Sequence, residues 1–183
     1  MTTDKNYNGY KGYKESPVFI QLTIIHDFTT EFTALYIDYK SRTRDQMDQA
    51  ARSAKQCWAE GFLQKSSESR LKMFGVTRCS LEELLHDYQD YLRQHQLSLW
   101  NQNDPRSLAI RRIAYNNYKG YNDYKRYISP PESAANCMIC LINQTNQLVD
   151  QKYRWEEKKF IEEGGFREQL LKKRLDYRQN NHF

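Results

Sequence analysis

Apolar side chains recur every three or four residues along most of the chain, the spacing of an α-helix with one buried face. The first such stretch runs from Val18 to Lys40, with Ser16 as N-cap and Pro17 at the first helical position. Its apolar stripe consists of Phe19, Leu22, Ile25, Phe28, Phe32, Leu35 and Tyr36. Residues 41–43 form a short break before the next helix.

A second helix is predicted over residues 44–61, because Thr43 and Gln46 have capping-box spacing and Gly61 marks an end. Its inner face is Met47, Ala50, Ala51, Ala54, Cys57 and Trp58, whose small members would let a neighbouring helix approach closely. A third helix is predicted over residues 68–95. It is lined by Leu71, Phe74, Cys79, Leu81, Leu84, Leu85, Tyr88, Tyr91 and Leu92.

Beyond residue 95 the pattern predicts a short helix from Asp104 to Ala114 and then a long one up to about Glu163. In the long helix Ser129 is the expected cap, Pro130 the first residue and Glu132 the capping-box partner. Its inner face is Cys137, Cys140, Leu141, Gln144, Leu148 and Trp155. After Gly164-Gly165 comes a basic amphipathic helix, with Phe166, Leu170, Leu171 and Leu175 against Arg167, Lys172, Lys173, Arg174 and Arg178.

These elements predict an all-α protein, an antiparallel up-down four-helix bundle over residues 16–163. Residues 96–131 form a Tyr-rich basic insertion between the third and fourth helices. Residues 1–15 are expected to be a flexible tract, and residues 164–183 a short C-terminal helix. With 7 Gly and 4 Pro in 183 residues, few positions interrupt a helix.

The composition and the N-terminal residues predict the cellular compartment of the protein. There is no run of 18 apolar residues, so we expect no membrane span. The polar start Met1–Lys5 lacks the apolar stretch of a signal peptide, and we expect a cytoplasmic protein. The four cysteines are expected to be reduced and mostly buried.

The net charge of +5 is concentrated in one segment. Residues 104–127 hold six basic and two acidic side chains, and their second half interleaves tyrosines with Lys119, Lys125 and Arg126. Cations attract phosphates and tyrosine rings stack on unpaired bases, so the segment predicts a contact with RNA or single-stranded DNA. The alternatives are a solvated linker or a loop whose tyrosines pack on the bundle.

The nucleic-acid-binding residues predicted from these patterns lie in the insertion and on the second helix. They are Arg42, Arg44, Arg52, Lys55, Arg106, Arg111, Arg112, Tyr118, Lys119, Tyr121, Tyr124, Lys125 and Arg126. The second-helix group is the weaker one, because its cations exceed Asp45, Asp48 and Glu60 by a single charge.

Two motifs could carry chemistry, but both are better explained structurally. Cys137-Met138-Ile139-Cys140 lies inside a helical stripe with no preceding strand, and a lone C-x-x-C supplies only two zinc ligands. Glu83-Leu84-Leu85-His86 is a single Glu-x-x-His, whereas a di-iron bundle needs two. We therefore expect no enzyme activity, no metal and no cofactor.

Parts of the chain resemble a known family. Gln49-Ala50-Ala51-Arg52-Ser53-Ala54 followed by Ala59-Glu60-Gly61 is similar to the second helix of the four-helix bundle protein family. That family includes proteins encoded in intervening sequences of large-subunit ribosomal RNA genes and the accessory variability determinant of diversity-generating retroelements. Cys79–Leu84 resembles part of the third helix, and Glu163–Glu168 the C-terminal segment of the family's suffix-domain branch.

The resemblance implies an up-down bundle that assembles as a pentamer and, in the retroelement members, binds a reverse transcriptase and nucleic acid. Trp58 and the 96–131 insertion depart from the family pattern. The leading hypothesis is thus a non-catalytic nucleic-acid-binding accessory protein with a reverse transcriptase as partner. The alternative is a homo-oligomeric protein-interaction scaffold with no nucleic-acid role.

Overall fold

A computed structural model describes residues 12–115 and 120–180, and every regular element within these ranges is helical. The elements are a 3-10 turn η1 (Tyr13–Glu15) and the helices α1 (Pro17–Tyr36), α2 (Arg42–Leu63), α3 (Ser67–Gln94), α4 (Pro105–Ile113), α5 (Tyr121–Lys125), α6 (Pro131–Glu163) and α7 (Phe166–Asn180). The predicted all-α class is confirmed for the described part of the chain.

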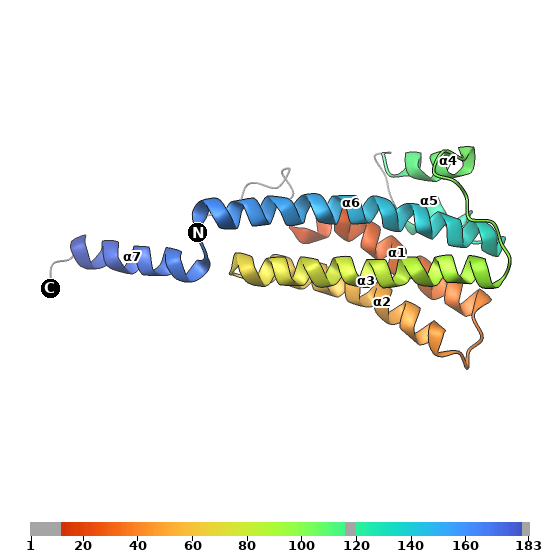
Figure 1. The fold of residues 1–183 in the computed structure, drawn as a ribbon, viewed down its shortest axis with the longest axis horizontal. Coiled ribbons are helices and arrows are strands. Elements are labelled where there is room, and N and C mark those ends of the chain that lie inside the picture. Colours follow the sequence, from red (N-terminus) through yellow and green to blue (C-terminus); the bar gives the residue numbers. More distant parts are fainter. Residues whose placement is uncertain (1–11, 116–119, 181–183) are drawn as a thin grey trace.

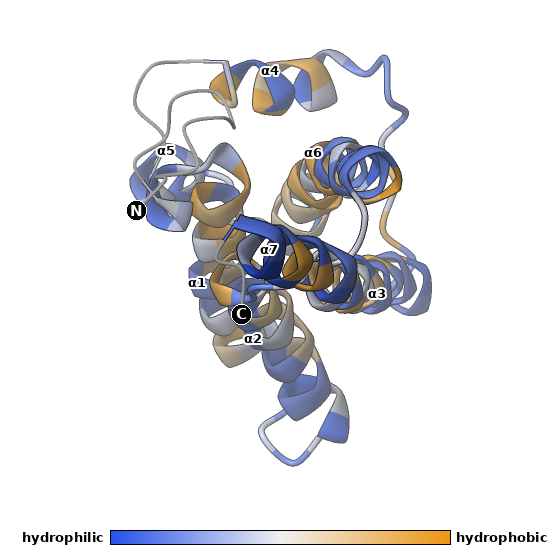
Figure 2. Cartoon of the chain, turned by 90° about the vertical axis from the view of Figure 1, so that its left-hand side faces the viewer, coloured by the Kyte–Doolittle hydropathy of each residue, from blue (hydrophilic) through white to orange (hydrophobic). Residues whose placement is uncertain are grey.

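The four long helices α1, α2, α3 and α6 lie side by side and form what we call the helical body (Figure 1). Within it, α1 packs against α2 and α6, and α3 also packs against α2 and α6. The short helix α4 lies on the outer side of α6, and α5 packs on α1 (Figure 2). Helix α7 extends beyond one end of the helical body, whereas α4 and α5 lie near the other end (Figure 1).

Large aromatic side chains fill the core between these helices. Trp58, Tyr88, Tyr124, Phe28, Phe32 and Phe74 are among the largest fully buried side chains. The predicted inner face of α2 is confirmed at Met47, Ala50, Ala51, Ala54 and Trp58, while Cys57 is half-buried. Two other predictions of burial are wrong: Leu35 is 56% exposed near the end of α1, and Cys79 is exposed on α3.

Gly61 does not end its helix, as the sequence pattern predicted, because α2 continues to Leu63. A Cβ at Gly61 would lie 2.5 Å from Cε1 of Phe74 on α3. Phe74 is itself buried and has little room to move. The glycine therefore allows α2 and α3 to approach closely at this end of the helical body.

The helix starts follow the sequence in one case and differ in two. Ser16 caps α1 as predicted, its Oγ accepting a hydrogen bond of 3.2 Å from the backbone N–H of Phe19. For α2 the cap is Ser41, whose Oγ accepts from the N–H of Thr43, so the predicted Thr43 capping box is wrong. Helix α6 begins one residue later than predicted, with Pro130 and not Ser129 at the N-cap.

Glu132, expected to cap α6, instead holds the insertion. Its carboxylate accepts hydrogen bonds from Nε1 of Trp100 at 2.8 Å and from the backbone N–H of Ser98 at 3.3 Å. One turn further along α6, the buried Asn136 accepts from the N–H of Trp100 and donates to the C=O of Ser98, both at 2.8 Å. These two α6 side chains fix the start of the insertion on the helical body.

No helix in the described ranges combines the length and the apolar content that a membrane crossing requires.

Candidate functional site

The tyrosines of the insertion do not form one exposed set. Tyr124 is fully buried, and its ring packs in the core. Tyr121 is half-buried, with its ring 6.3 Å from that of Phe28 in an edge-on contact. In this structure the ring face of Tyr124 is not open to a base, so the alternative of packing on the bundle describes Tyr124 better. Tyr118 and Lys119 lie outside the described residues.

Two of the predicted cations are occupied by neighbouring groups. Arg106 pairs with Asp104 at 2.8 Å, lies 3.7 Å from Glu132, and covers the ring of Trp100 at 4.0 Å from the centroid. Arg111 is half-buried and donates through Nε to the C=O of Ser107. Arg106 therefore helps to hold the insertion, and a phosphate would have to compete with the contacts of either arginine.

The other described cations of the insertion face solvent. Arg112 on α4, together with Lys125 and Arg126 at the end of α5, is exposed. Among the described residues none of the three makes an ion pair, although Lys125 and Arg126 lie over the rings of Tyr121 and Tyr127. We call these three cations together with Tyr115 the insertion surface.

Tyr115 was absent from the predicted site residues, although it belongs to the same tract. It is 83% exposed at the end of α4, which makes it the most accessible tyrosine of the described insertion. Periodicity could not separate it from Tyr124, because both sit in the same Tyr/Asn/Lys pattern. Only the packing of α5 against α1 shows which tyrosine is buried.

The α2 cations lie among acidic and polar partners. Arg42 and Arg52 are exposed, but Arg42 shares an open groove of about 490 Å³ with Asp45 and Glu83. Lys55 is half-buried, and its Nζ lies 2.8 Å from Nδ1 of His26. Burial and the nearby Lys55 lower the pKa of His26, so its ring is neutral and accepts this hydrogen bond.

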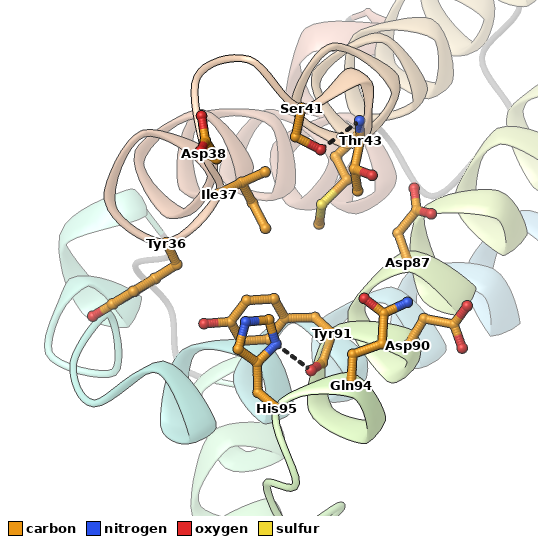
Figure 3. Close-up of a pocket in the computed structure, with 11 residues that line it drawn as sticks. Tyr36, Ile37, Asp38, Ser41, Thr43, Asp87, Asp90, Tyr91, Gln94 and His95 are labelled. Carbon is orange, nitrogen blue, oxygen red and sulfur yellow. Dashed lines mark hydrogen bonds between the residues drawn. The ribbon is translucent and has the colours of Figure 1, made fainter.

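The pocket between the α1–α2 connection and the C-terminal end of α3 encloses about 280 Å³ (Figure 3). Three carboxylates line it, those of Asp38, Asp87 and Asp90, beside Tyr91 and His95. The last carbonyls of α1 and α3 also end here and add negative partial charge. A phosphate is therefore disfavoured in this pocket.

Asp87 is the most perturbed carboxyl of this pocket. Burial, together with the neighbouring Glu83 and Asp90, raises its pKa to about 6. Its Oδ2 is buried and accepts no hydrogen bond within the described residues. This carboxyl therefore exchanges a proton near neutral pH and makes the stability of the helical body depend on pH.

A second ionisable cluster lies near the other end of the helical body. Glu156 is fully buried, with Oε1 3.2 Å from Nη1 of Arg70 and Oε2 3.6 Å from Nζ of Lys152. The Lys152 ammonium also lies 3.7 Å from the ring centroid of Trp155. Burial lowers the pKa of Lys152 to about 8, against the opposing effect of Glu156. The geometry is that of a structural ion-pair network joining α3 to α6.

The two motifs examined for chemistry have structural positions. Cys137 is buried in the core and Cys140 is half-buried, and burial raises the pKa of both thiols, which disfavours the reactive thiolate. Glu83 and His86 are exposed on α3. Across the described ranges, no group of three or more His, Cys, Asp or Glu side chains has an arrangement that could hold a metal ion.

Helix α7 carries the other concentration of positive charge. It has five basic residues, Arg167, Lys172, Lys173, Arg174 and Arg178, against the acidic Glu168 and Asp176. None of its residues is buried. The sequence predicted this helix and its charge but not its position outside the helical body.

Comparison of the chain with protein-family models, with curated proteins and with solved structures found no match.

Proposed function

We propose that the protein is a non-catalytic accessory protein that binds RNA or single-stranded DNA through the insertion surface. The observation that carries the proposal is the exposure of Arg112 on α4, of Lys125 and Arg126 at the end of α5, and of the ring of Tyr115. Cations free of acidic partners can neutralise phosphates, and an exposed tyrosine can stack on an unpaired base. Recognition would be of the backbone and of base faces, not of sequence.

The proposal includes an arrangement of the helices that suits a rigid support. We infer an antiparallel up-down four-helix bundle in which Asn136 and Glu132 of α6 hold the insertion at one end. Such anchoring fixes where the exposed cations stand, so that little ordering entropy is lost on binding. The reverse transcriptase partner and the pentamer remain predictions from the family resemblance of the α2 segment.

The test is a fluorescence polarisation titration of a labelled 20-nucleotide uridine RNA and its DNA counterpart at 50 and 200 mM KCl. We expect affinity to fall with salt, with a log–log slope of about −0.7 for each phosphate contacted. The triple variant R112Q/K125Q/R126Q should reduce the steepness by about 2 and lower the affinity at 50 mM KCl by roughly tenfold or more.

The matched control removes the same charge elsewhere. In R42Q/R44Q/R52Q three α2 cations are neutralised, and these lie among Asp45, Asp48 and Glu83. We expect this variant to lose much less affinity than the insertion variant. Equal losses of affinity in the two triple variants would mean that only the overall charge of the protein matters, which contradicts the proposed site. An affinity that does not change with salt concentration would contradict the proposed function.

A protein-interaction role is the second candidate, and helix α7 favours it. Exposed apolar side chains on that helix include Leu171 at 57% and Tyr177 at 67%. Nucleic acid would leave such side chains uncovered. The two roles are compatible, because α7 and the insertion lie near opposite ends of the helical body (Figure 1).

A further inference from the structure

Helix α7 is directed away from the helical body by its two preceding glycines. Gly164 has φ 78°, a backbone conformation that favours glycine, and its N–H ends α6 by donating to the C=O of Phe160. Gly165 approaches α3 so closely that a Cβ there would lie 2.6 Å from Oε1 of Glu68. The Glu168 carboxylate accepts a hydrogen bond of 3.0 Å from the N–H of Gly165, and so pairs a backbone donor at the start of α7.

Three arginines form a single line along α7. Arg167, Arg174 and Arg178 are seven and four residues apart, and residues at these spacings fall on one side of an α-helix. All three are exposed. The acidic residues Glu168 and Asp176 lie away from this line, by about a quarter-turn and a half-turn respectively at 100° per residue.

Apolar side chains flank the arginine line on both sides. Helical geometry places Phe166, Leu170 and Tyr177 along one flank and Leu171 and Leu175 along the other. Their exposed fractions are 37%, 48%, 67%, 57% and 47%. We call the arginine line with these two flanks the α7 face.

This composition discriminates among the classes of molecule that could cover the α7 face. A second copy of the helix, face to face, would set arginines against arginines, which is repulsive. A membrane-surface helix carries its cations outside the apolar face, whereas here three of the five cations run along its centre. RNA or DNA would neutralise the arginines but leave five apolar side chains in water.

We propose that the α7 face binds an acidic amphipathic helix of another protein. Carboxylates along the centre of that helix would pair with Arg167, Arg174 and Arg178, since the guanidinium fork matches a carboxylate in two-point geometry. Leucine-type side chains on either side of the carboxylates would cover the two apolar flanks of α7. Two helices joined in this way bury a charged centre and the apolar side chains on both sides of it. The partner helix supplies the carboxylates that complement the arginine line.

The probe is a synthetic fluorescein-labelled 18-residue helical peptide. Its glutamates stand seven and four residues apart in one line with leucines on both sides, and a second peptide has glutamine at the same positions. Both are titrated with the full chain and followed by fluorescence polarisation. We expect the glutamate peptide to bind and the glutamine peptide to bind at least tenfold more weakly.

Matched variants locate the contact on the protein. R167Q/R174Q/R178Q should weaken binding of the glutamate peptide roughly thirtyfold, at about threefold for each exposed pair. K65Q/K172Q/K173Q removes the same charge but leaves the arginine line intact, and should change the affinity by less than threefold. L170A/L171A/L175A should also weaken binding, while circular dichroism checks that each variant keeps its helix content.

Four results would overturn the proposal. One is equal weakening by the arginine and lysine variants, which would mean bulk attraction only. Another is equal binding of the glutamine peptide. A third is a greater loss of affinity for the 20-nucleotide RNA, or for phosphatidylserine vesicles, than for the peptide when the arginines are replaced. The fourth is a dimer, seen by light scattering at working concentrations, that disappears when α7 is removed, because a second copy would then occupy the face.

Discussion

The insertion and helix α7 are both short, basic and partly apolar, yet only the insertion packs onto the helical body. Within the insertion Tyr124 is fully buried, and Ile110 and Ile113 of α4 are buried as well. In α7 no residue is buried, and Leu171 and Leu175 remain about half-exposed. Two segments of similar composition therefore differ in burial, since the insertion packs into the helical body and α7 stays exposed.

The difference lies in the polar groups that receive each segment. Asn136 and Glu132 of α6 bond the main chain and indole of residues 98–100, which holds the chain before α4 on the helical body, while α5 packs on α1. On the α7 side, the two glycines lead the chain past the end of the body, and Glu68 is the neighbour met by Gly165. Positive charge alone thus says little about whether a basic segment is free for a partner.

The largest expected effect is on the buried tyrosine of the insertion. Replacing Tyr124 with Ala should lower the free energy of unfolding by about 3–5 kcal/mol, because it leaves a cavity beneath α5. Urea denaturation measures this loss. Y124F keeps the ring and removes a buried hydroxyl that has no hydrogen-bond partner in the described residues, so its stability should equal or exceed that of the parent.

The matching control is Tyr115, the exposed tyrosine of the same tract. Y115A should change stability by less than about 0.5 kcal/mol, since its side chain is mostly exposed. If Y115A destabilises as much as Y124A, the assignment of one tyrosine to the core and one to the surface is wrong.

The next effect concerns the anchor of the insertion. N136A should lower the free energy of unfolding by about 2–3 kcal/mol, because it leaves the Trp100 N–H and the Ser98 C=O without their partner. Asn143→Ala is the control, since that side chain is exposed and bonds within its own helix. Hydrogen exchange should show faster exchange at residues 98–113 in N136A. Unchanged exchange there would mean that Asn136 does not hold the insertion.

A smaller effect depends on pH. The pKa of Asp87 is raised to about 6, above its ordinary value near 3.9, so the folded state binds more protons between these values. This contribution is fully present below pH 4 and is lost as pH rises through 6. D87N removes this buried charge and the pH dependence with it, and at pH 7 should raise the free energy of unfolding by about 1 kcal/mol, allowing for partial exposure.

The measurement for Asp87 is urea denaturation at pH 4, 5, 6 and 7. The difference between D87N and the parent should grow over this range, while D45N, on an exposed side chain, should show no such growth. A constant difference across the range would refute the assignment to Asp87.

The smallest effect is expected for the free helix. Ending the chain after Gly165 removes α7 and should change the free energy of unfolding by less than about 0.5 kcal/mol, because no buried side chain is lost. Thermal and urea denaturation of the shortened chain measure this. A loss of 2 kcal/mol or more would show that α7 packs on the body in solution and would remove the contrast with the insertion.

The sequence by itself determined the helical class, the approximate bounds of the long helices and much of the core. Apolar spacing identified Leu22, Ile25, Phe28 and Trp58 as buried, because periodicity reports which side of a helix faces its neighbours. The Ser16 cap was predictable for a similar reason, since capping depends on a few adjacent residues. Local rules were less reliable at the start of α2, where Ser41 and Thr43 are both suitable N-cap residues and Ser41 is the cap in the structure.

Only the tertiary structure decided which basic and aromatic residues remain accessible. Tyr115 and Tyr124 belong to one tract of Tyr, Asn and Lys, and the contact of α5 with α1 buries the second. Arg106 and Arg112 are both exposed on α4, but Glu132 of the distant helix α6 lies near Arg106. Likewise the spacing of Arg167, Arg174 and Arg178 is written in the sequence, whereas their exposure is not. Accessibility depends on residues distant in the chain, and a local pattern contains no information about those contacts.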